Sequence, residues 1–156
     1  MKHVLFFLCL VLSIFCQTQA VAFQLSHVME QNVRTVADVA TSYIDLLNRI
    51  GASPNASYAD DVESLFAPDC IKIVNGSIWF EDSSQVVPQL QRTAEEVGSW
   101  SIKLLDLIPG QDERTVVVRF LVPTEKGIWN TLVILRCNDQ LQITEINEVF
   151  NNYEGA

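Results

Sequence analysis

Histidine is scarce in this chain, and its cysteines form no recognisable motif. The 156 residues include two histidines, His3 and His27, and four cysteines with no CxxC pair. The sequence also lacks an HExxH motif. Zinc sites need clustered Cys and His ligands, and a Ser-His-Asp triad needs a histidine beside its serine. The composition therefore argues against both kinds of site, predicts no metal, and implies no cofactor.

Basic residues are also few. Ten Lys and Arg stand against nineteen Asp and Glu, for a formal net charge of -9. No stretch gathers Lys and Arg into the basic stripe typical of nucleic-acid-binding proteins. We therefore expect neither nucleic acid nor an anionic membrane as a partner, and the negative charge is interpreted as favouring solubility.

The N-terminus has the pattern of a secretory signal peptide. Lys2 and His3 precede the apolar run 4–15, and an A-x-A site follows at residues 20–22. This run is shorter than the roughly 20 apolar residues that a membrane span needs. We predict cleavage after Ala22, with cleavage after Ala20 as the alternative. Residues 1–22 are then a signal peptide and residues 23–156 a single exported domain, periplasmic or secreted, with no membrane attachment after cleavage.

Two cysteines, Cys70 and Cys137, remain after the predicted cleavage. In an oxidising compartment they can form a disulfide if their Cα atoms lie within about 7 Å of each other. Each can equally be a small buried hydrophobic residue. Both alternatives stay open at the level of the sequence.

Apolar residues recur at helical spacing in three segments. The predicted helices cover residues 25–50, 59–66 and 83–97. We expect them to end at Gly51, Pro68 and Gly98. The run Asp82-Ser83-Ser84 offers an N-cap for the third helix.

Strand patterns fill the rest of the chain. Asn75-Gly76 separates the runs 71–74 and 77–81, and this pair favours a hairpin because both turn residues need positive φ. Four further runs, joined by short turns, cover residues 100–108, 114–122, 128–137 and 141–150. Consecutive strands with short links predict an antiparallel meander. The predicted class is α+β, with about three helices on one face of a strongly bent, mainly antiparallel sheet.

Two stretches, SYIDLLNRI at 42–50 and LFAPDCIKIV at 65–74, carry a family resemblance. They resemble the nuclear transport factor 2-like superfamily, especially its SnoaL-like and SgcJ/EcaC-like members. The resemblance covers nearly all of the predicted mature chain and implies a cone-shaped fold that encloses a pocket. Members use that pocket for unrelated tasks, so the resemblance implies a fold rather than a reaction.

The steroid isomerase branch of this superfamily has a defined catalytic set. Its tyrosine, which donates a hydrogen bond to the developing oxyanion, matches Tyr43. Its two carboxylates have no match, because Val74 stands at the general-base position and residues 131–135 read TLVIL. Proton abstraction needs a base within hydrogen-bond reach. Steroid isomerase chemistry is therefore not expected here.

Several polar residues are candidates for the implied pocket. The Tyr43 hydroxyl either bonds to a protein neighbour or donates to a ligand. Asp69 and Glu145 are weak catalytic candidates, and Asp69 alternatively binds nearby backbone N–H groups. Strand alternation lets Lys72 face the pocket together with Val74, but hydrophobicity favours the neighbouring isoleucines inside and Lys72 in solvent.

The other ligand-binding candidates are Trp79, Arg119, Glu145 and Asn147. Trp79 either packs in the core or lines an apolar pocket. Arg119 and Glu145 form a buried pair in one interpretation and belong to a solvated sheet face in the other.

Three functions fit the sequence. The leading hypothesis is an exported pocket domain that binds a small apolar or amphipathic molecule, because no complete catalytic set is visible. The second is a SnoaL-like isomerase, cyclase or hydrolase that uses a pocket carboxylate. The third is homodimerisation or association through the exposed sheet face, which a contiguous apolar patch on that face would favour.

Overall fold

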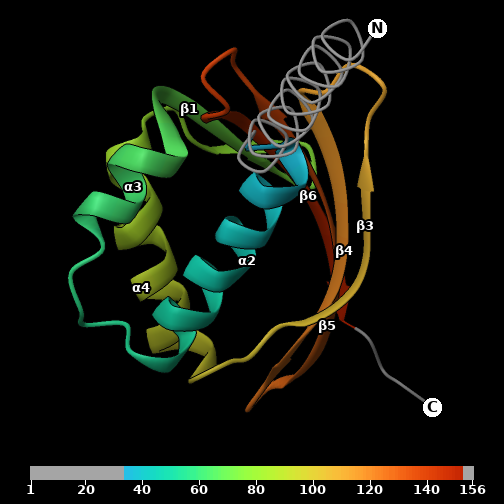
Figure 1. Ribbon diagram of the computed structural model, residues 1–156. Helices are drawn as coiled ribbons and strands as arrows, with labels where there is room; N and C mark the ends of the chain where they lie inside the picture. Colours follow the sequence, from blue (N-terminus) through green and yellow to red (C-terminus); the bar gives the residue numbers. More distant parts are fainter. Residues whose placement is uncertain (1–33, 153–156) are drawn as a thin grey trace, which may run out of the picture. The chain divides into compact units, whose positions relative to one another are not determined.

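The computed structural model describes residues 34–152 of the chain (Figure 1). The predicted signal peptide, both predicted cleavage sites and the first part of the predicted helix 25–50 lie outside the described residues. Within residues 34–152, no helix is both long and apolar enough to cross a membrane.

The first described helix, α2, spans Val36–Ala52 and begins with a capping box. The Thr35 side chain accepts a hydrogen bond from the Asp38 backbone N–H, and the Asp38 carboxylate accepts one from the Thr35 backbone N–H at 2.8 Å. This reciprocal pair satisfies two N–H groups that have no partner inside the helix.

Gly51 does not end this helix, contrary to expectation. The helix continues to Ala52, and the Ser53 backbone N–H closes it on the Arg49 carbonyl at 2.9 Å. A Cβ at Gly51 would lie 2.5 Å from Nε1 of Trp100. The glycine is therefore needed for the close approach of the Trp100 indole rather than for a helix cap.

Helix α3 spans Ala59–Leu65, and strand β1 follows directly as Phe66–Val74. The prediction that Pro68 ends the helix is wrong, since the chain is already extended at Phe66. The reason is tertiary: Phe66 is buried, pairs with Ile143 in the sheet and packs edge-on against the Tyr43 ring at 6.3 Å.

The predicted Asn75-Gly76 hairpin is confirmed. The two residues have φ of 48° and 80°, and strand β2, Ser77–Phe80, returns antiparallel to β1. The Asn75 side chain also accepts from the Phe150 backbone N–H at 3.1 Å and donates to the Phe150 carbonyl at 3.4 Å. The turn is thereby attached to the last strand of the sheet.

The third predicted helix begins as a short 3₁₀ turn. The turn η2, Ser83–Gln85, precedes helix α4, Val86–Val97. The Asp82 carboxylate accepts from the Ser84 backbone N–H at 2.7 Å, and Gly98 ends α4 with a φ of 76°. The predicted N-cap run 82–84 and the predicted end at Gly98 thus lie where the chain changes conformation.

The predicted meander is confirmed as four consecutive antiparallel strands. They are β3 Lys103–Pro109, β4 Thr115–Thr124, β5 Gly127–Cys137 and β6 Ile143–Asn152. Strand β1 joins β6 in parallel, so the six-stranded order is β2-β1-β6-β5-β4-β3. Figure 1 shows α2, α3 and α4 on one side of this curved sheet. The α+β class with three helices on one face is therefore confirmed for residues 34–152.

The alternative in which Cys70 and Cys137 form a disulfide is wrong for this structure. Both cysteines are free and buried, and burial raises the pKa of Cys70 to about 12 and that of Cys137 to about 11. Strand β6 separates their strands, β1 and β5. Two strand spacings amount to roughly 9–10 Å, which exceeds the reach of a disulfide. The two thiols act as small buried hydrophobic groups.

Gly76→Val tests the hairpin. Gly76 has a φ of 80°, and a Cβ added there would meet no atom within 4 Å, so only backbone strain opposes a side chain. A β-branched residue resists positive φ, and we expect a loss of about 1–2 kcal/mol in the free energy of unfolding, measured by urea denaturation. Ser77→Val, in the adjoining strand, is the control and should change the midpoint little. Equal midpoints for the Gly76→Val variant and the wild type would contradict the turn assignment.

Candidate ligand-binding cavity

A cavity of about 240 Å³ lies between the helices and the curved sheet. Its walls come from α2, α4, β1, β2, β4, β5, β6 and the segment that follows α4. Six aromatic side chains line it: Tyr43, Trp79, Trp100, Phe120, Trp129 and Phe150. The cavity is therefore largely apolar, as small-molecule sites usually are.

The aromatic wall is held by packing and by one hydrogen bond. Phe150 makes T-shaped contacts with Trp129 at 5.4 Å and with Trp79 at 6.5 Å between ring centroids. The Trp100 indole N–H donates to the Leu47 carbonyl at 3.0 Å. These contacts fix the orientation of the rings before any ligand is present.

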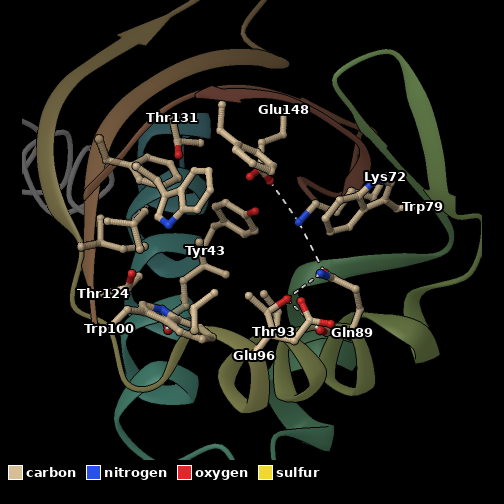
Figure 2. Close-up of a pocket in the computed structure, with 18 residues that line it drawn as sticks. Tyr43, Lys72, Trp79, Gln89, Thr93, Glu96, Trp100, Thr124, Thr131 and Glu148 are labelled. Atoms are coloured by element: carbon tan, nitrogen blue, oxygen red, sulfur yellow. Dashed lines mark hydrogen bonds and ion pairs between the residues drawn. The ribbon is translucent and has the colours of Figure 1, made fainter. Parts of the chain in front are cut away.

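A chain of polar groups crosses one side of the cavity (Figure 2). Nζ of Lys72 lies 3.0 Å from a Glu148 carboxylate oxygen and 3.5 Å from the Gln89 side-chain oxygen. The Gln89 amide nitrogen donates in turn to the Thr93 hydroxyl at 3.1 Å. The cavity therefore has an apolar wall and a polar side.

Lys72 is only 5% exposed, so the expectation that it is solvated is wrong. Strand alternation places Cys70, Lys72 and Val74 on the buried face of β1 and leaves the two isoleucines half-buried. A buried ammonium is stable only when it is paired. Here Glu148 supplies the opposite charge, and the Trp79 ring lies 5.5 Å from Nζ in a cation–π contact.

Tyr43 lines the cavity and is 2% exposed. In Figure 2 its hydroxyl points toward the side that carries Lys72 and Glu148. Burial, and then the negative charge of Glu148, raise the pKa of Tyr43 well above its usual value, so the hydroxyl stays protonated at neutral pH. Within residues 34–152, no hydrogen bond joins this hydroxyl to the protein. It is therefore available as a donor inside the cavity.

Of the other predicted ligand-binding residues, only Trp79 lines the cavity. Arg119 is exposed and lies 3.6 Å from Asp106, while Glu145 lies 3.5 Å from Arg136. Of the two alternatives for Arg119 and Glu145, the buried pair between them is therefore wrong. The cause is strand parity, because the cavity takes Glu148 and Phe150 from β6, on the face opposite to Glu145 and Asn147.

The two catalytic candidates also lie away from the cavity. Asp69 is exposed near the middle of β1, and in the part of the chain that is described no backbone N–H donates a hydrogen bond to its carboxylate. Within residues 34–152, the only ion pair of Glu145 is the one with Arg136. The carboxylates that do line the cavity are Glu96 and Glu148.

Glu148, Gln89, Thr93, Glu96 and Thr131 are cavity residues that sequence reasoning missed. A signal for three of them was present: Gln89, Thr93 and Glu96 are spaced four and three residues apart, so they share one face of α4. Within residues 34–152, no group of three or more His, Cys, Asp or Glu is placed to hold a metal ion.

The Lys72–Glu148 pair can be tested by removing its charges in turn. Lys72→Met keeps the length of the side chain but leaves the Glu148 carboxylate unpaired, so we expect a loss of about 3 kcal/mol in the free energy of unfolding. Lys72→Met combined with Glu148→Met should recover most of that loss. The control is Arg119→Met, which breaks a half-exposed pair and should cost less than about 1 kcal/mol. Equal losses for Lys72→Met and Arg119→Met would show that the Lys72 pair is not buried.

Comparison with known proteins identifies the fold. No family model matches the chain, and no curated protein matches its sequence. An NTF2-like (nuclear transport factor 2-like) protein of unknown function from Exiguobacterium sp. 255-15 is similar with a TM-score of 0.59 and 19% identity, over 72% of this chain and 98% of that one. A protein of the SnoaL-like family from Agrobacterium tumefaciens is similar with a TM-score of 0.59 and 9% identity, over 73% of this chain and 95% of that one.

A steroid delta-isomerase from Pseudomonas aeruginosa is similar with a TM-score of 0.54 and 15% identity, over 75% of this chain and 82% of that one. At these identities the likeness concerns the fold alone, and the three proteins differ in what is known of their activity. Residues 34–152 therefore have the NTF2-like fold.

Proposed function

We propose that this domain binds a small amphipathic molecule in the cavity between its helices and its sheet. One observation carries the proposal: a 240 Å³ space lined by six aromatic rings also contains the Tyr43 hydroxyl, which has no protein partner within residues 34–152. A cavity of roughly 150 Å³ suffices for benzene. This space suits a ring with a short polar substituent.

The arrangement of the walls supports an amphipathic ligand over a purely apolar one. The Tyr43 side chain lines the cavity, where a ligand oxygen or nitrogen can accept a hydrogen bond from its hydroxyl. Thr131, 3% exposed, also places its hydroxyl at the cavity. The rings of Trp100, Trp129 and Phe150 would contact the apolar part of the same molecule. With the predicted signal peptide, such binding would take place outside the cytoplasm.

An enzymatic role would have to use Glu148 or Glu96, since Asp69 and Glu145 do not line the cavity. Glu148 is already paired with Lys72 at 3.0 Å. Binding requires only the contacts described above, and we therefore propose binding rather than a reaction.

Self-association through the sheet is a second proposal, and exposed apolar residues favour it. Leu132 and Val149 are opposite each other in the β5–β6 pair and are 40% and 55% exposed. Ile108 on β3 and Ile78 on β2 are 60% and 62% exposed. Apolar side chains on an open sheet face are typical of surfaces that bind another protein chain.

Native mass spectrometry tests the binding proposal. We expect the protein, purified without denaturation from cells that express the full chain, to retain a non-covalent small molecule. Thr131→Phe should abolish this adduct by filling the cavity, whereas Thr131→Val, which keeps the volume, should preserve it. An unliganded wild-type protein, or an adduct that survives Thr131→Phe, would contradict binding at this site.

Tyr43→Phe separates a ligand donor from a structural hydrogen bond. The ring packing is kept, so we expect little change in the free energy of unfolding but about fivefold to tenfold weaker binding of the co-purifying molecule, as for the loss of about 1 kcal/mol. Tyr58→Phe is the control, because the Tyr58 hydroxyl lies 2.8 Å from the carbonyl oxygens of Arg49 and Ser53. That change should lower stability and leave binding intact. The opposite pattern would assign Tyr43 a structural role.

Sedimentation velocity tests the second proposal. We expect a dimer for the wild-type protein and a monomer for Leu132→Lys, because a charge at the centre of the sheet face cannot be buried without a partner. Lys103→Glu, at the exposed start of β3, is a charge-changing control. A wild-type monomer at micromolar concentration would refute association through this face.

A further inference from the structure

We infer that the ligand of this cavity is an organic cation, a small ammonium compound with an aromatic or short aliphatic body. The inference rests on the proposed binding function and adds the charge of the ligand. Four features of the described residues support it: the charges at the cavity, the end of α4, the aromatic wall and the cavity size.

The charges at the cavity do not cancel. Its lining contains two carboxylates, Glu96 and Glu148, and one cation, Lys72. Lys72 and Glu148 neutralise each other at 3.0 Å. Among residues 34–152, no ion pair engages Glu96, which leaves a net charge of about −1 facing the space. An anionic ligand would be repelled there, and a cation would be attracted.

The C-terminal end of α4 adds negative potential at the same place. Glu96 and Val97 line the cavity and belong to the last turn of this helix. That turn contains no basic residue. Carbonyl groups at a helix C-terminus carry a partial negative charge that favours cations. The Glu125 side chain also packs there, because a Cβ at Gly98 would lie 2.7 Å from its carboxyl carbon. Two carboxylates and a helix end thus lie close together, and among residues 34–152 neither carboxylate takes part in an ion pair.

The aromatic wall supplies faces that bind cations. All three tryptophans of the chain, Trp79, Trp100 and Trp129, line the cavity. The structure already shows one ammonium in this setting, since Nζ of Lys72 lies 5.5 Å from the Trp79 ring centroid. Figure 2 shows Glu96 beside Thr93 and Gln89, with Trp100 at the same edge of the cavity. Indole rings together with carboxylates are the usual means of recognising quaternary ammonium groups.

The size of the cavity completes the fit. A volume of about 240 Å³ exceeds the roughly 150 Å³ that holds benzene, which leaves room for one ring and a compact ammonium group. The Tyr43 side chain is 2% exposed and lines this space, and within residues 34–152 its hydroxyl has no hydrogen-bond partner. Its ring offers a further π surface.

Three probes of nearly equal shape and different charge test the inference. They are benzyltrimethylammonium, its uncharged isostere neopentylbenzene, and the anion phenylmethanesulfonate. Binding to the exported full-chain product is followed by tryptophan fluorescence, because every tryptophan lines the cavity. We expect the cation to bind at least tenfold more tightly than either of the other probes.

Glu96→Gln and Glu95→Gln form a matched pair of variants. Both glutamates are exposed and adjoin each other on α4, but Glu96 lines the cavity and Glu95 does not. Glu96→Gln should weaken cation binding at least fivefold, and Glu95→Gln should leave it unchanged. Equal effects of the two variants would overturn the role of Glu96.

The outcomes separate the two proposals. Neutral or anionic probes that bind as tightly as the cation would overturn the cationic ligand class while leaving a binding cavity in place. Absence of saturable binding by all three probes would contradict the binding function itself.

Discussion

The parallel pairing of β1 with β6 is the constraint on which the site depends. It brings Lys72 and Glu148, which lie far apart in the sequence, onto the same face of adjacent strands, where Nζ and the carboxylate are 3.0 Å apart. Burying either charge alone would lower the free energy of unfolding by several kcal/mol. Each residue can therefore be buried because the other one neutralises its charge. The Asn75 side chain reinforces this pairing through its two hydrogen bonds to the backbone of Phe150.

This pairing also explains why the cavity is open and polar on one side. Most of the space enclosed by the helices and the curved sheet is filled by large apolar side chains, including Leu46, Phe66 and Leu135. Around Lys72, the distances from Nζ to Glu148 and to Gln89 are set by polar contacts rather than by close packing of apolar side chains. The aromatic rings of the cavity are positioned by contacts with one another and by the Trp100–Leu47 hydrogen bond. The walls are therefore in place before a ligand binds, which reduces the entropy lost on binding.

Local patterns predicted the elements well and the faces of the strands poorly. The Asn75-Gly76 turn and the meander depend on short-range signals, and both are confirmed. Whether Lys72 faces inward depends on Glu148, a partner that no local pattern reveals. A shift of one residue reverses every side chain of a strand, which is why Arg119, Glu145 and Asn147 were assigned to the cavity while Glu148 was missed. The predictions that helices end at Gly51 and at Pro68 are wrong for a similar reason. Trp100 packs against Gly51, and Ile143 pairs with Phe66 just before Pro68, and both partners come from distant segments of the chain.

The inward, paired state of Lys72 is the central claim, and the reactivity of its amine tests it most directly. Brief acetylation of the native protein, followed by mass spectrometry of its peptides, compares Lys72 with the exposed residues Lys103 and Lys126. We expect Lys103 and Lys126 to be acetylated at least tenfold faster than Lys72, whose side chain is 6% exposed. Acetylation of Lys72 at the rate of Lys103 would contradict the account, because it would place the opposite face of β1 against the helices.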